Sequence, residues 1–158
     1  MAKQEAPPEM LEQLRILSNR PRPQRHRFMV TGGAGYIGAA VVRELVAAEH
    51  EVLIFDNLTT GKLADARANL VAGDVLDTAT LAATVQLFRP DVILHLAGPS
   101  NARASIEEPA FYYDNIVNAA QAIAELGAFD CWGRRVLFAS SCAIYGNASG
   151  QVDETGPA

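Results

Sequence analysis

The sequence predicts an α/β protein built on a doubly wound parallel sheet, and three observations support this prediction. From residue 28 onward, short apolar runs are interspersed with longer stretches in which apolar residues recur at helical spacing. The short runs leave no face polar, which is typical of parallel strands covered by helices on both sides. Three glycines also stand where the first apolar run passes into the first helical stretch.

The elements are expected in the following order along the chain. Strands are predicted at residues 28–31, 52–55, 69–72, 92–97 and 136–139. Helices are predicted at residues 36–49, 77–88 and 107–126. The first helix has an apolar face made of Ile37, Val41, Val42, Leu45 and Val46. Pro90 is expected to stop the second helix and Gly127 the third. The sheet is therefore expected to be truncated after about five strands.

Composition limits the classes of function. The 158 residues suffice for one folded domain, and 49% hydrophobic with 20% charged residues is an ordinary globular composition. A formal net charge of −5 argues against a nucleic-acid partner, which needs a basic face. No apolar run approaches the roughly 20 residues that span a bilayer, so no membrane partner is expected. Because there are only two cysteines, Cys131 and Cys142, we expect reduced thiols, no metal site and a cytoplasmic location.

Residues 1–27 differ in character from the rest and are interpreted as an N-terminal extension and linker. Basic residues outnumber acidic ones there, and four prolines interrupt the segment. Apolar residues at helical spacing favour a short amphipathic helix at residues 8–17. The segment is either a mobile or lightly docked tail, or a surface for a partner or a membrane. Residues 28–158 form the second predicted unit.

The stretch TGGAGYIG, residues 31–38, matches a dinucleotide-binding fingerprint because it lies between a predicted strand and a predicted helix. Gly32 is expected to permit the tight turn, Gly35 to let a pyrophosphate approach the backbone, and Gly38 to let the helix pack closely on the strand. The N-terminus of that helix presents unpaired N–H groups and a partial positive charge to the phosphates. The alternative is a structural glycine turn without a ligand.

Two acidic residues follow the next two predicted strands. Asp56 lies about 20 residues past the middle glycine, where a carboxylate accepts hydrogen bonds from the adenosine ribose. A carboxylate there repels a 2′-phosphate, so NAD is favoured over NADP. The alternative for Asp56 is a loop-capping acid. Asp74 follows the third strand and is either an adenine contact or a simple turn acid.

Six motifs together resemble the extended short-chain dehydrogenase/reductase family of NAD-dependent epimerases and dehydratases, most closely the UDP-glucose 4-epimerases. In chain order they are VTGGAGYIG, FDNLTTG, GDVLD, HLAG, YYDNIVN and FASSCAIYG. The resemblance runs from about Phe28 to the end of the sequence. It implies a Rossmann-type NAD-binding domain. It also implies a bound cofactor that oxidises a nucleotide sugar, a UDP-sugar, at C4 and reduces it again on the opposite face.

The resemblance also assigns roles to individual residues. It implies cofactor contacts from Gly32, Gly35, Tyr36, Ile37, Gly38, Asp56, Asn57, Asp74, Val75, Leu96, Ala97, Gly98 and Asn115. Ser141 matches the catalytic serine that hydrogen-bonds the sugar oxygen. From the residues alone, Ser140 and Ser141 are equally well interpreted as a polar strand terminus.

The sequence departs from the family pattern at two places. The family uses a Tyr-x-x-x-Lys pair as its acid–base group, in which the lysine lowers the pKa of the phenol. None of the four tyrosines is followed four residues later by a lysine, and the family spacing would place the pair after Ala158. Ser100 stands where the family often has a lysine or glutamine that reaches the nicotinamide ribose. Arg103 is either a replacement for that group or a solvated loop residue.

Three functional interpretations remain open from the sequence. The chain is the N-terminal part of an NAD-dependent nucleotide-sugar epimerase or dehydratase, a non-catalytic dinucleotide-binding module, or one part of a split enzyme. Without further strands, the fifth strand is left as an apolar edge with unpaired backbone groups. We therefore expect a homodimer or a partner that completes the sheet.

Overall fold

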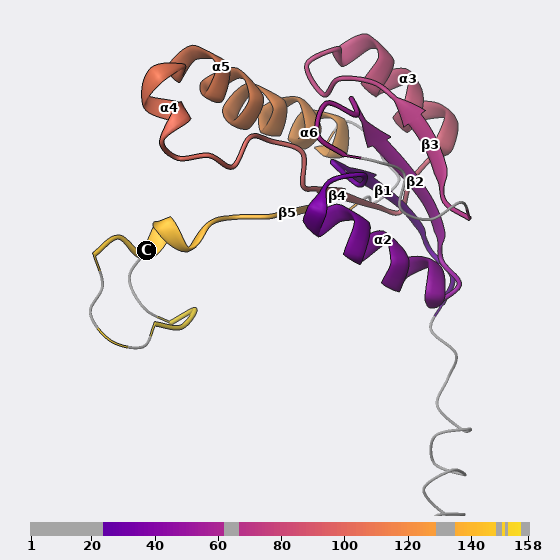
Figure 1. The fold of residues 1–158 in the computed structure, drawn as a ribbon. Coiled ribbons are helices and arrows are strands. Elements are labelled where there is room, and N and C mark those ends of the chain that lie inside the picture. Colours follow the sequence, from indigo (N-terminus) through magenta and orange to yellow (C-terminus); the bar gives the residue numbers. More distant parts are fainter. Residues whose placement is uncertain (1–23, 62–66, 129–134, 148–149, 151, 156–158) are drawn as a thin grey trace, which may run out of the picture.

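A five-stranded parallel sheet organises the protein, and it confirms the predicted doubly wound architecture (Figure 1). The computed structural model describes residues 24–61, 67–128, 135–147, 150 and 152–155. The strand order is β3-β2-β1-β4-β5. The strands are β1 (Arg27–Thr31), β2 (Glu51–Asp56), β3 (Asn69–Ala72), β4 (Val92–His95) and β5 (Arg135–Phe138). The predicted helix at residues 8–17 lies outside the described residues.

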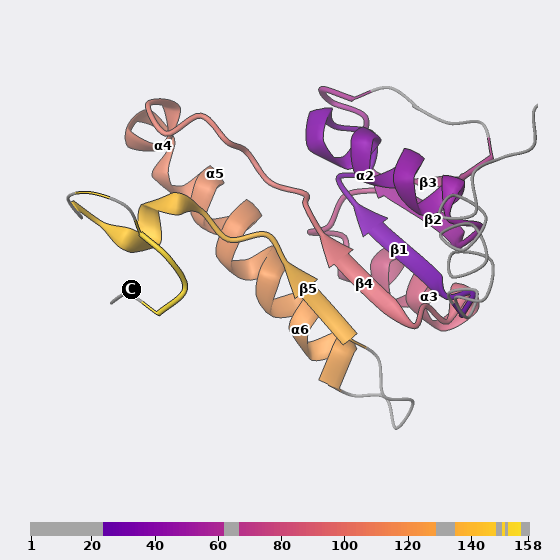
Figure 2. The same cartoon turned by 90° about the horizontal axis from the view of Figure 1, so that it is seen from below.

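The sheet is covered on both faces because its central strands alternate their side chains between two apolar clusters. Met29 of β1 belongs to a cluster with residues of α3 and α6, whereas the next residue, Val30, belongs to a cluster with Val42 of α2. Helix α2 (Tyr36–Ala47) lies on one face, and α3 (Thr78–Phe88) and α6 (Ala119–Ala128) lie on the other (Figures 1 and 2). The continuous apolar runs in the sequence are therefore strands without a solvated face.

The first predicted helix differs from its prediction in which residues it buries. Gly38 and Val42 are the buried residues of α2, whereas Ile37, placed on the apolar face by its spacing, is 64% exposed. The reason is local: a Cβ on Gly38 would collide with the carbonyl oxygen of Gly32. The helix therefore packs through a glycine at this turn, and the bulkier neighbouring side chain points outward.

The third predicted helix is divided into shorter elements. These are α4 (Ala104–Glu107), α5 (Pro109–Tyr113), the π-helical turn η1 (Asp114–Asn118) and α6. Glu108 leaves helical geometry at φ −128° and ψ 56°, because the residue before a proline disfavours the α conformation. Gly127 does not end the helix as predicted. A Cβ there would lie 2.5 Å from Cγ2 of Val136, so this glycine lets α6 pack closely on β5.

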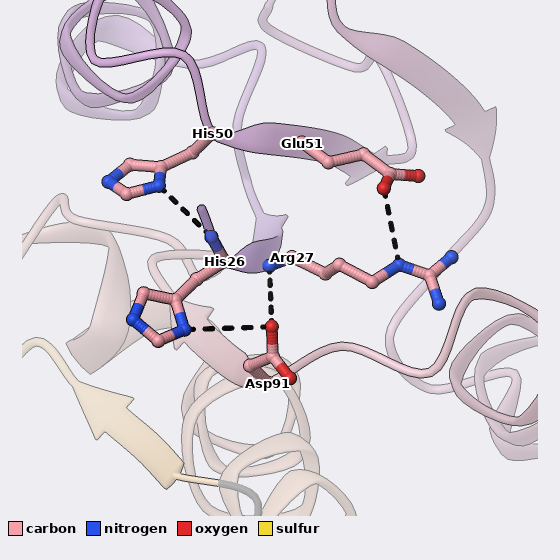
Figure 3. A network of polar contacts seen from close by, with 5 residues as sticks. All are labelled: His26, Arg27, His50, Glu51 and Asp91. Carbon is pink, nitrogen blue, oxygen red and sulfur yellow. Dashed lines mark hydrogen bonds and ion pairs between the residues drawn. The ribbon is translucent and has the colours of Figure 1, made fainter. Parts of the chain in front are cut away.

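A polar network connects the amino ends of three strands, at the end of the sheet remote from the glycine turn (Figure 3). The backbone N–H of Arg27 donates to Oδ2 of Asp91 at 2.7 Å, and that of His26 donates to Nδ1 of His50 at 3.2 Å. An ion pair joins Arg27 Nε to Glu51 Oε2 at 3.4 Å, and His26 Nδ1 lies 3.7 Å from Asp91 Oδ2. This network holds β1, β2 and the start of β4 together at the end of the sheet remote from the glycine turn.

Candidate functional site

The glycine turn lies at the carboxyl end of β1, where α/β sheets bind ligands. Gly32 adopts a left-handed φ of 69°, and a Cβ there would lie 2.6 Å from the backbone nitrogen of Ala97. Any side chain at this position would therefore push β1 and the segment after β4 apart. The turn closes through a hydrogen bond from the N–H of Gly35 to the carbonyl of Gly32 at 3.1 Å.

The N-terminus of α2 faces outward from this turn without a capping side chain. Gly35 is the N-cap residue, no side chain accepts from the first helical N–H groups, and no acidic residue lies in the first turn. Unpaired N–H groups and the helix dipole together favour an anion at such a terminus. The loop therefore has the form that binds phosphate in dinucleotide-binding proteins.

Asp56 connects the glycine turn to the end of β2. Its Oδ2 accepts from the N–H of Ala34 at 3.0 Å, and its Oδ1 accepts from the N–H of Leu58 at 2.8 Å. The side chain is buried at the wall of a cavity. Because each carboxylate oxygen has a second lone pair, both oxygens can still accept a hydrogen bond from a ligand hydroxyl. Asp56 is thus a loop-capping acid and a possible ligand acceptor at the same time.

A cavity of about 340 Å³ opens over the carboxyl ends of β1 and β2. The predicted site residues that line it are Gly32, Gly35, Asp56, Asn57, Val75, Leu96, Ala97, Gly98 and Asn115. It is also lined by residues that the sequence argument missed: Phe55, Thr59, Thr60, Gly73, Pro99 and Phe111. The threonines had a signal, since they follow Asp56 within the FDNLTTG motif.

A second cavity, of about 730 Å³, lies over the ends of β4 and β5. Leu96, Ala97, Gly98 and Pro99 line both cavities, so the two are neighbours that share one wall. The larger cavity is mostly apolar, with Tyr112, Tyr113 and Phe138 among its lining residues and Ser140 and Ser141 at its polar end. Together the cavities form an elongated site along one edge of the sheet, suited to a ligand with two separated ring systems.

Four predicted cofactor residues line neither cavity. Tyr36 and Ile37 project from the first turn of α2, with Tyr36 98% exposed, and Gly38 packs beneath the loop. Asp74 is occupied locally: Oδ1 accepts from the N–H of Leu76 at 2.9 Å, and Oδ2 accepts from Nδ2 of Asn57 at 3.1 Å. These bonds are those of a turn acid, the alternative interpretation of Asp74, and they also orient Asn57 at the cavity wall.

Asn115 reaches the smaller cavity from the π-helical turn η1. Its Nδ2 donates to the carbonyl of Phe111 at 2.9 Å, which leaves its Oδ1 as an acceptor. A single π turn inside a helix shifts the residues that follow it and is frequent at functional sites. The sequence placed Asn115 on a helix but gave no signal for this turn.

Ser141 caps the 3-10 helix η2 (Cys142–Tyr145) at the polar end of the larger cavity. Its Oγ accepts from the N–H of Ala143 at 3.2 Å, and its hydroxyl hydrogen is therefore free to donate. Cys142, beside it, is an exposed free thiol. Ser141 is thus both the predicted polar terminus and a donor placed at the cavity.

His95 is a buried polar residue at the larger cavity that the sequence argument did not single out. It is 2% exposed at the end of β4 and lines the larger cavity. Its Nδ1 lies 2.6 Å from Oγ1 of Thr31, the residue before the glycine turn. Burial lowers the pKa of His95, because a charged imidazolium is poorly solvated there. The sequence could have indicated His95, because it is the ionisable residue at the end of an apolar strand in the HLAG motif.

Two other kinds of feature are absent from the described residues. No helix there has both the length and the apolar character needed to cross a membrane. No three or more His, Cys, Asp and Glu side chains there are grouped so that they could hold a metal ion.

Comparison with known proteins connects this geometry to a family. The sequence model of the NAD dependent epimerase/dehydratase family matches residues 28–158. Curated UDP-glucose 4-epimerases from Lacticaseibacillus casei and Lactobacillus helveticus are 37% and 38% identical over 132 and 123 residues. These matches cover 81% and 76% of this chain but only 39% and 37% of the relatives. The chain therefore spans about two fifths of the length of the curated relatives that it matches.

Solved structures show the same likeness in three dimensions. UDP-glucose 4-epimerase from Brucella ovis in complex with NAD matches with a TM-score of 0.77 at 32% identity, over 84% of this chain and 41% of that one. The Thermus thermophilus enzyme, also a complex with NAD, matches with a TM-score of 0.77 at 31% identity, over 83% and 43%. The Thermotoga maritima enzyme with UDP-glucose matches with a TM-score of 0.72 at 29% identity, over 79% and 41%.

Proposed function

Because the chain belongs to the NAD dependent epimerase/dehydratase family, we propose that it provides the NAD-binding part of a nucleotide-sugar epimerase of the UDP-glucose 4-epimerase type. The observation that carries the proposal is the pair of adjoining cavities, which share residues 96–99 and begin at an uncapped helix N-terminus. An extended dinucleotide needs such a site, with an anion-binding loop between two ring pockets.

The residues of the smaller cavity fit the adenosine half of NAD. Asp56 would accept hydrogen bonds from the ribose hydroxyls through the lone pairs that Ala34 and Leu58 leave free. Asn57, held by Asp74, would lie beside the same ribose. The N–H groups at the start of α2, next to Gly35, would face the pyrophosphate. Because the Asp56 carboxylate would repel a 2′-phosphate, NAD fits this site better than NADP.

The larger cavity would receive the nicotinamide half and the sugar of a UDP-sugar substrate. When bound there, NAD would supply the hydride chemistry, taking a hydride from C4 of the sugar and returning it. Ser141 would donate its free hydroxyl hydrogen to the sugar oxygen at that carbon. The mostly apolar wall, which includes Tyr112 and Phe138, would exclude water from that half of the site.

The acid–base pair of the family is not among these 158 residues, because no tyrosine is followed by a lysine at the required spacing. General acid–base groups typically contribute about 10² to 10⁴ in rate. We therefore propose that the 158-residue chain by itself does not convert UDP-glucose, and that other polypeptide would have to supply the pair. Turnover of UDP-glucose by the purified chain, removed by Ser141→Ala, would contradict this part of the proposal.

Two further expectations belong to the same proposal. No strand among the described residues pairs with the outer edge of β5, where Leu137 and Phe138 are exposed, and this suits a homodimer contact or a sheet-completing partner. The free thiol of Cys142 is consistent with a reducing compartment, and a cytoplasmic location is proposed on that basis.

The test is a fluorescence titration of NADH into the purified chain. Asp56→Ala should weaken binding roughly 10- to 100-fold, since a hydrogen bond to a charged group is worth about 1.5 to 3 kcal/mol. Glu44→Ala on the exposed face of α2 removes the same charge away from the cavities and should leave binding unchanged. NADPH should bind more weakly than NADH. A folded chain that binds neither nucleotide would reject the proposal.

A non-catalytic dinucleotide-binding module and one part of a split enzyme are the alternatives, and turnover separates them. A chain that binds NADH tightly but gains no turnover with any partner would be a non-catalytic dinucleotide-binding module. A split enzyme would instead recover turnover when the polypeptide that carries the pair is added. Adding the C-terminal part of a UDP-glucose 4-epimerase and measuring UDP-glucose conversion separates these two outcomes.

A further inference from the structure

Thr31, His95 and Phe138 lie side by side across three neighbouring strands at the carboxyl edge of the sheet. The parallel register pairs Thr31 with His95 and His95 with Phe138. The hydroxyl of Thr31 contacts the His95 ring at Nδ1, and the His95 ring lies 5.7 Å from the Phe138 ring at an angle of 33°. The row therefore begins one residue before the glycine turn and ends two residues before Ser140.

The backbone strengthens the same connection on both sides of His95. The N–H of Leu96 donates to the carbonyl of Thr31 at 3.0 Å, and the N–H of Ala139 donates to the carbonyl of His95 at 3.3 Å. The N–H of Ala97 also approaches Oγ1 of Thr31 at 3.4 Å. A movement of His95 would therefore shift both the glycine turn and the segment that carries Ser140 and Ser141.

The hydrogen-bond pattern assigns a tautomer to His95. The Thr31 hydroxyl has a single hydrogen, and the described residues offer it no acceptor other than Nδ1 of His95. If that hydrogen is donated to Nδ1, the ring is neutral and carries its own proton at Nε2. If Nδ1 carried the proton instead, the buried hydroxyl hydrogen of Thr31 would have no acceptor among these residues.

Nε2 of His95 is buried and has no hydrogen-bond partner among the described residues. A phenyl ring would fill the same space without burying an unpaired N–H, so packing alone does not explain an imidazole here. What the imidazole adds is an acceptor for Thr31 that exists only while the ring is neutral. His95 thus provides Thr31 with a hydrogen-bond acceptor, which an apolar ring of the same shape would not provide.

We propose that His95 is a positioning residue whose neutral ring, fixed by Thr31, holds the glycine turn and the Ser140–Ser141 segment in one mutual arrangement. The inference deepens the proposed function and rests on it for the binding readout below. Protonation would place a hydrogen on Nδ1 against the Thr31 hydroxyl and a charge in an apolar surrounding. Among the described residues, no carboxylate lines the larger cavity to compensate that charge, and the titratable side chains that line it besides His95 are Tyr112 and Tyr113. Protonation of His95 should therefore reverse the bond, so that Nδ1–H donates to Oγ1 and the hydroxyl hydrogen of Thr31 is left without an acceptor among the described residues.

Burial also favours the neutral ring, because it holds the pKa of His95 below the ordinary histidine value. The ring is therefore neutral at neutral pH. Once the pH is below the lowered pKa, the fraction of neutral ring falls about tenfold for each pH unit. If only the neutral form holds the site together, NADH affinity should decrease by the same factor over that range.

The first experiment observes the ring directly and needs no ligand. Imidazole ¹⁵N NMR of the chain at neutral pH should show a neutral ring protonated at Nε2. As the pH is lowered, the backbone amide signals of Gly32, Ala97 and Ser141 should shift together with the His95 titration. A ring protonated at Nδ1, or amide signals that ignore the titration, would overturn the inference whether or not the chain binds NADH.

The second experiment compares the pH dependence of NADH affinity in matched variants. His95→Asn keeps an acceptor for Thr31 but cannot be protonated, so its affinity should lose the acid-side decrease seen in the wild-type chain. Thr31→Val should weaken binding at neutral pH, and Thr31→Ser should restore it. His26 and His50 are unchanged in every variant and lie at the opposite end of the sheet, so any effect they have on the affinity is common to all the variants. The same acid-side decrease in His95→Asn would contradict the proposal, and circular dichroism at each pH identifies any unfolding.

Discussion

The glycine-turn half of the sheet and the serine half differ in how completely they are covered. In β2 every residue after Glu51 is buried, and its side chains divide between the two apolar clusters. In β5 no residue is buried, and Leu137 and Phe138 are 51% and 53% exposed. The outer strand β3 is also an edge, but its Leu70 and Val71 pack against the two clusters. The cofactor half thus carries its own core, whereas among the described residues of β5 only Val136 packs against a core cluster, next to Gly127 of α6.

The two halves should therefore respond differently to substitutions. Residues around the glycine turn are held by strands paired on both sides, so a substitution there disturbs the folded core. The segment after β5 is held on one side by β4 and by the row that ends at Phe138. We therefore expect large effects on stability in the first half and mainly local or intermolecular effects in the second.

The largest expected difference is between two phenylalanines. Phe55 is fully buried in the middle of the sheet, so Phe55→Ala should lower the free energy of unfolding by about 3 to 5 kcal/mol. Phe138→Ala should lower it by about 1 kcal/mol or less, because half of that side chain is already exposed. Urea denaturation followed by circular dichroism measures both. Equal losses would mean that the serine half is as tightly packed as the cofactor half.

The next comparison uses two glycines with left-handed backbones, at φ 69° for Gly32 and 57° for Gly146. Gly32→Ala adds a Cβ that collides with the backbone at Ala97, so we expect a loss of about 2 to 4 kcal/mol and of NADH binding. A Cβ on Gly146 meets nothing within 4 Å. Gly146→Ala should therefore cost about 1 to 3 kcal/mol, from its backbone conformation at φ 57° and ψ −134° alone, and leave NADH binding intact. The same titration and denaturation series decides whether steric overlap is what separates them.

A smaller effect is expected on the self-association of two chains through the edge strand β5. Leu137→Lys places a charge on the exposed edge strand and should weaken self-association by roughly tenfold or more, as edge lysines do in natural sheets. Leu87→Lys, on the exposed face of α3, is the matched control and should change nothing. Sedimentation velocity across a concentration series measures the association. A wild-type chain that stays monomeric throughout would remove β5 as a contact surface.

The same division explains how much of the molecule the sequence predicted. The strand at residues 69–72 was placed at its observed bounds, and Gly32 lies in the tight turn expected of it, because these features depend on local pattern and backbone geometry. The break at Glu108 also had a local signal in Pro109, which the predicted long helix ignored. Elements whose determinants lie close in sequence were therefore predictable.

Features that depend on distant neighbours were not predicted. The packing role of Gly127 in α6 follows from its contact with Val136 of β5. The pairing of His95 with Thr31 joins residues 64 positions apart. The π-helical turn at Asn115 is a change of hydrogen-bond register that residue spacing does not encode. The site residues that the sequence argument missed therefore depend on contacts between elements that are far apart in the sequence.

The smallest expected difference concerns two helix caps, one in each half. Asp77 caps α3 by accepting from the N–H of Thr80 at 3.1 Å and from its hydroxyl at 2.6 Å, and these bonds hold the pKa of Asp77 below its ordinary value. A carboxyl whose pKa is lower in the folded than in the unfolded state stabilises the fold above the unfolded pKa. That stabilisation is lost as the pH falls below about 4 toward the folded value. Asp77→Ala should therefore remove a part of the acid sensitivity of unfolding, as should Thr80→Val.

Ser141 caps the short helix η2 through the N–H of Ala143, but no residue of that helix is buried. Ser141→Ala should therefore change the free energy of unfolding by no more than about 0.5 kcal/mol at any pH. Acid denaturation of the two variants beside the wild-type chain measures the contrast. If Ser141→Ala destabilised the protein as much as Asp77→Ala, the segment after β5 would be coupled to the core by contacts beyond the Thr31–His95–Phe138 row. The independence of the two halves would then fail at the residue expected to reach the substrate.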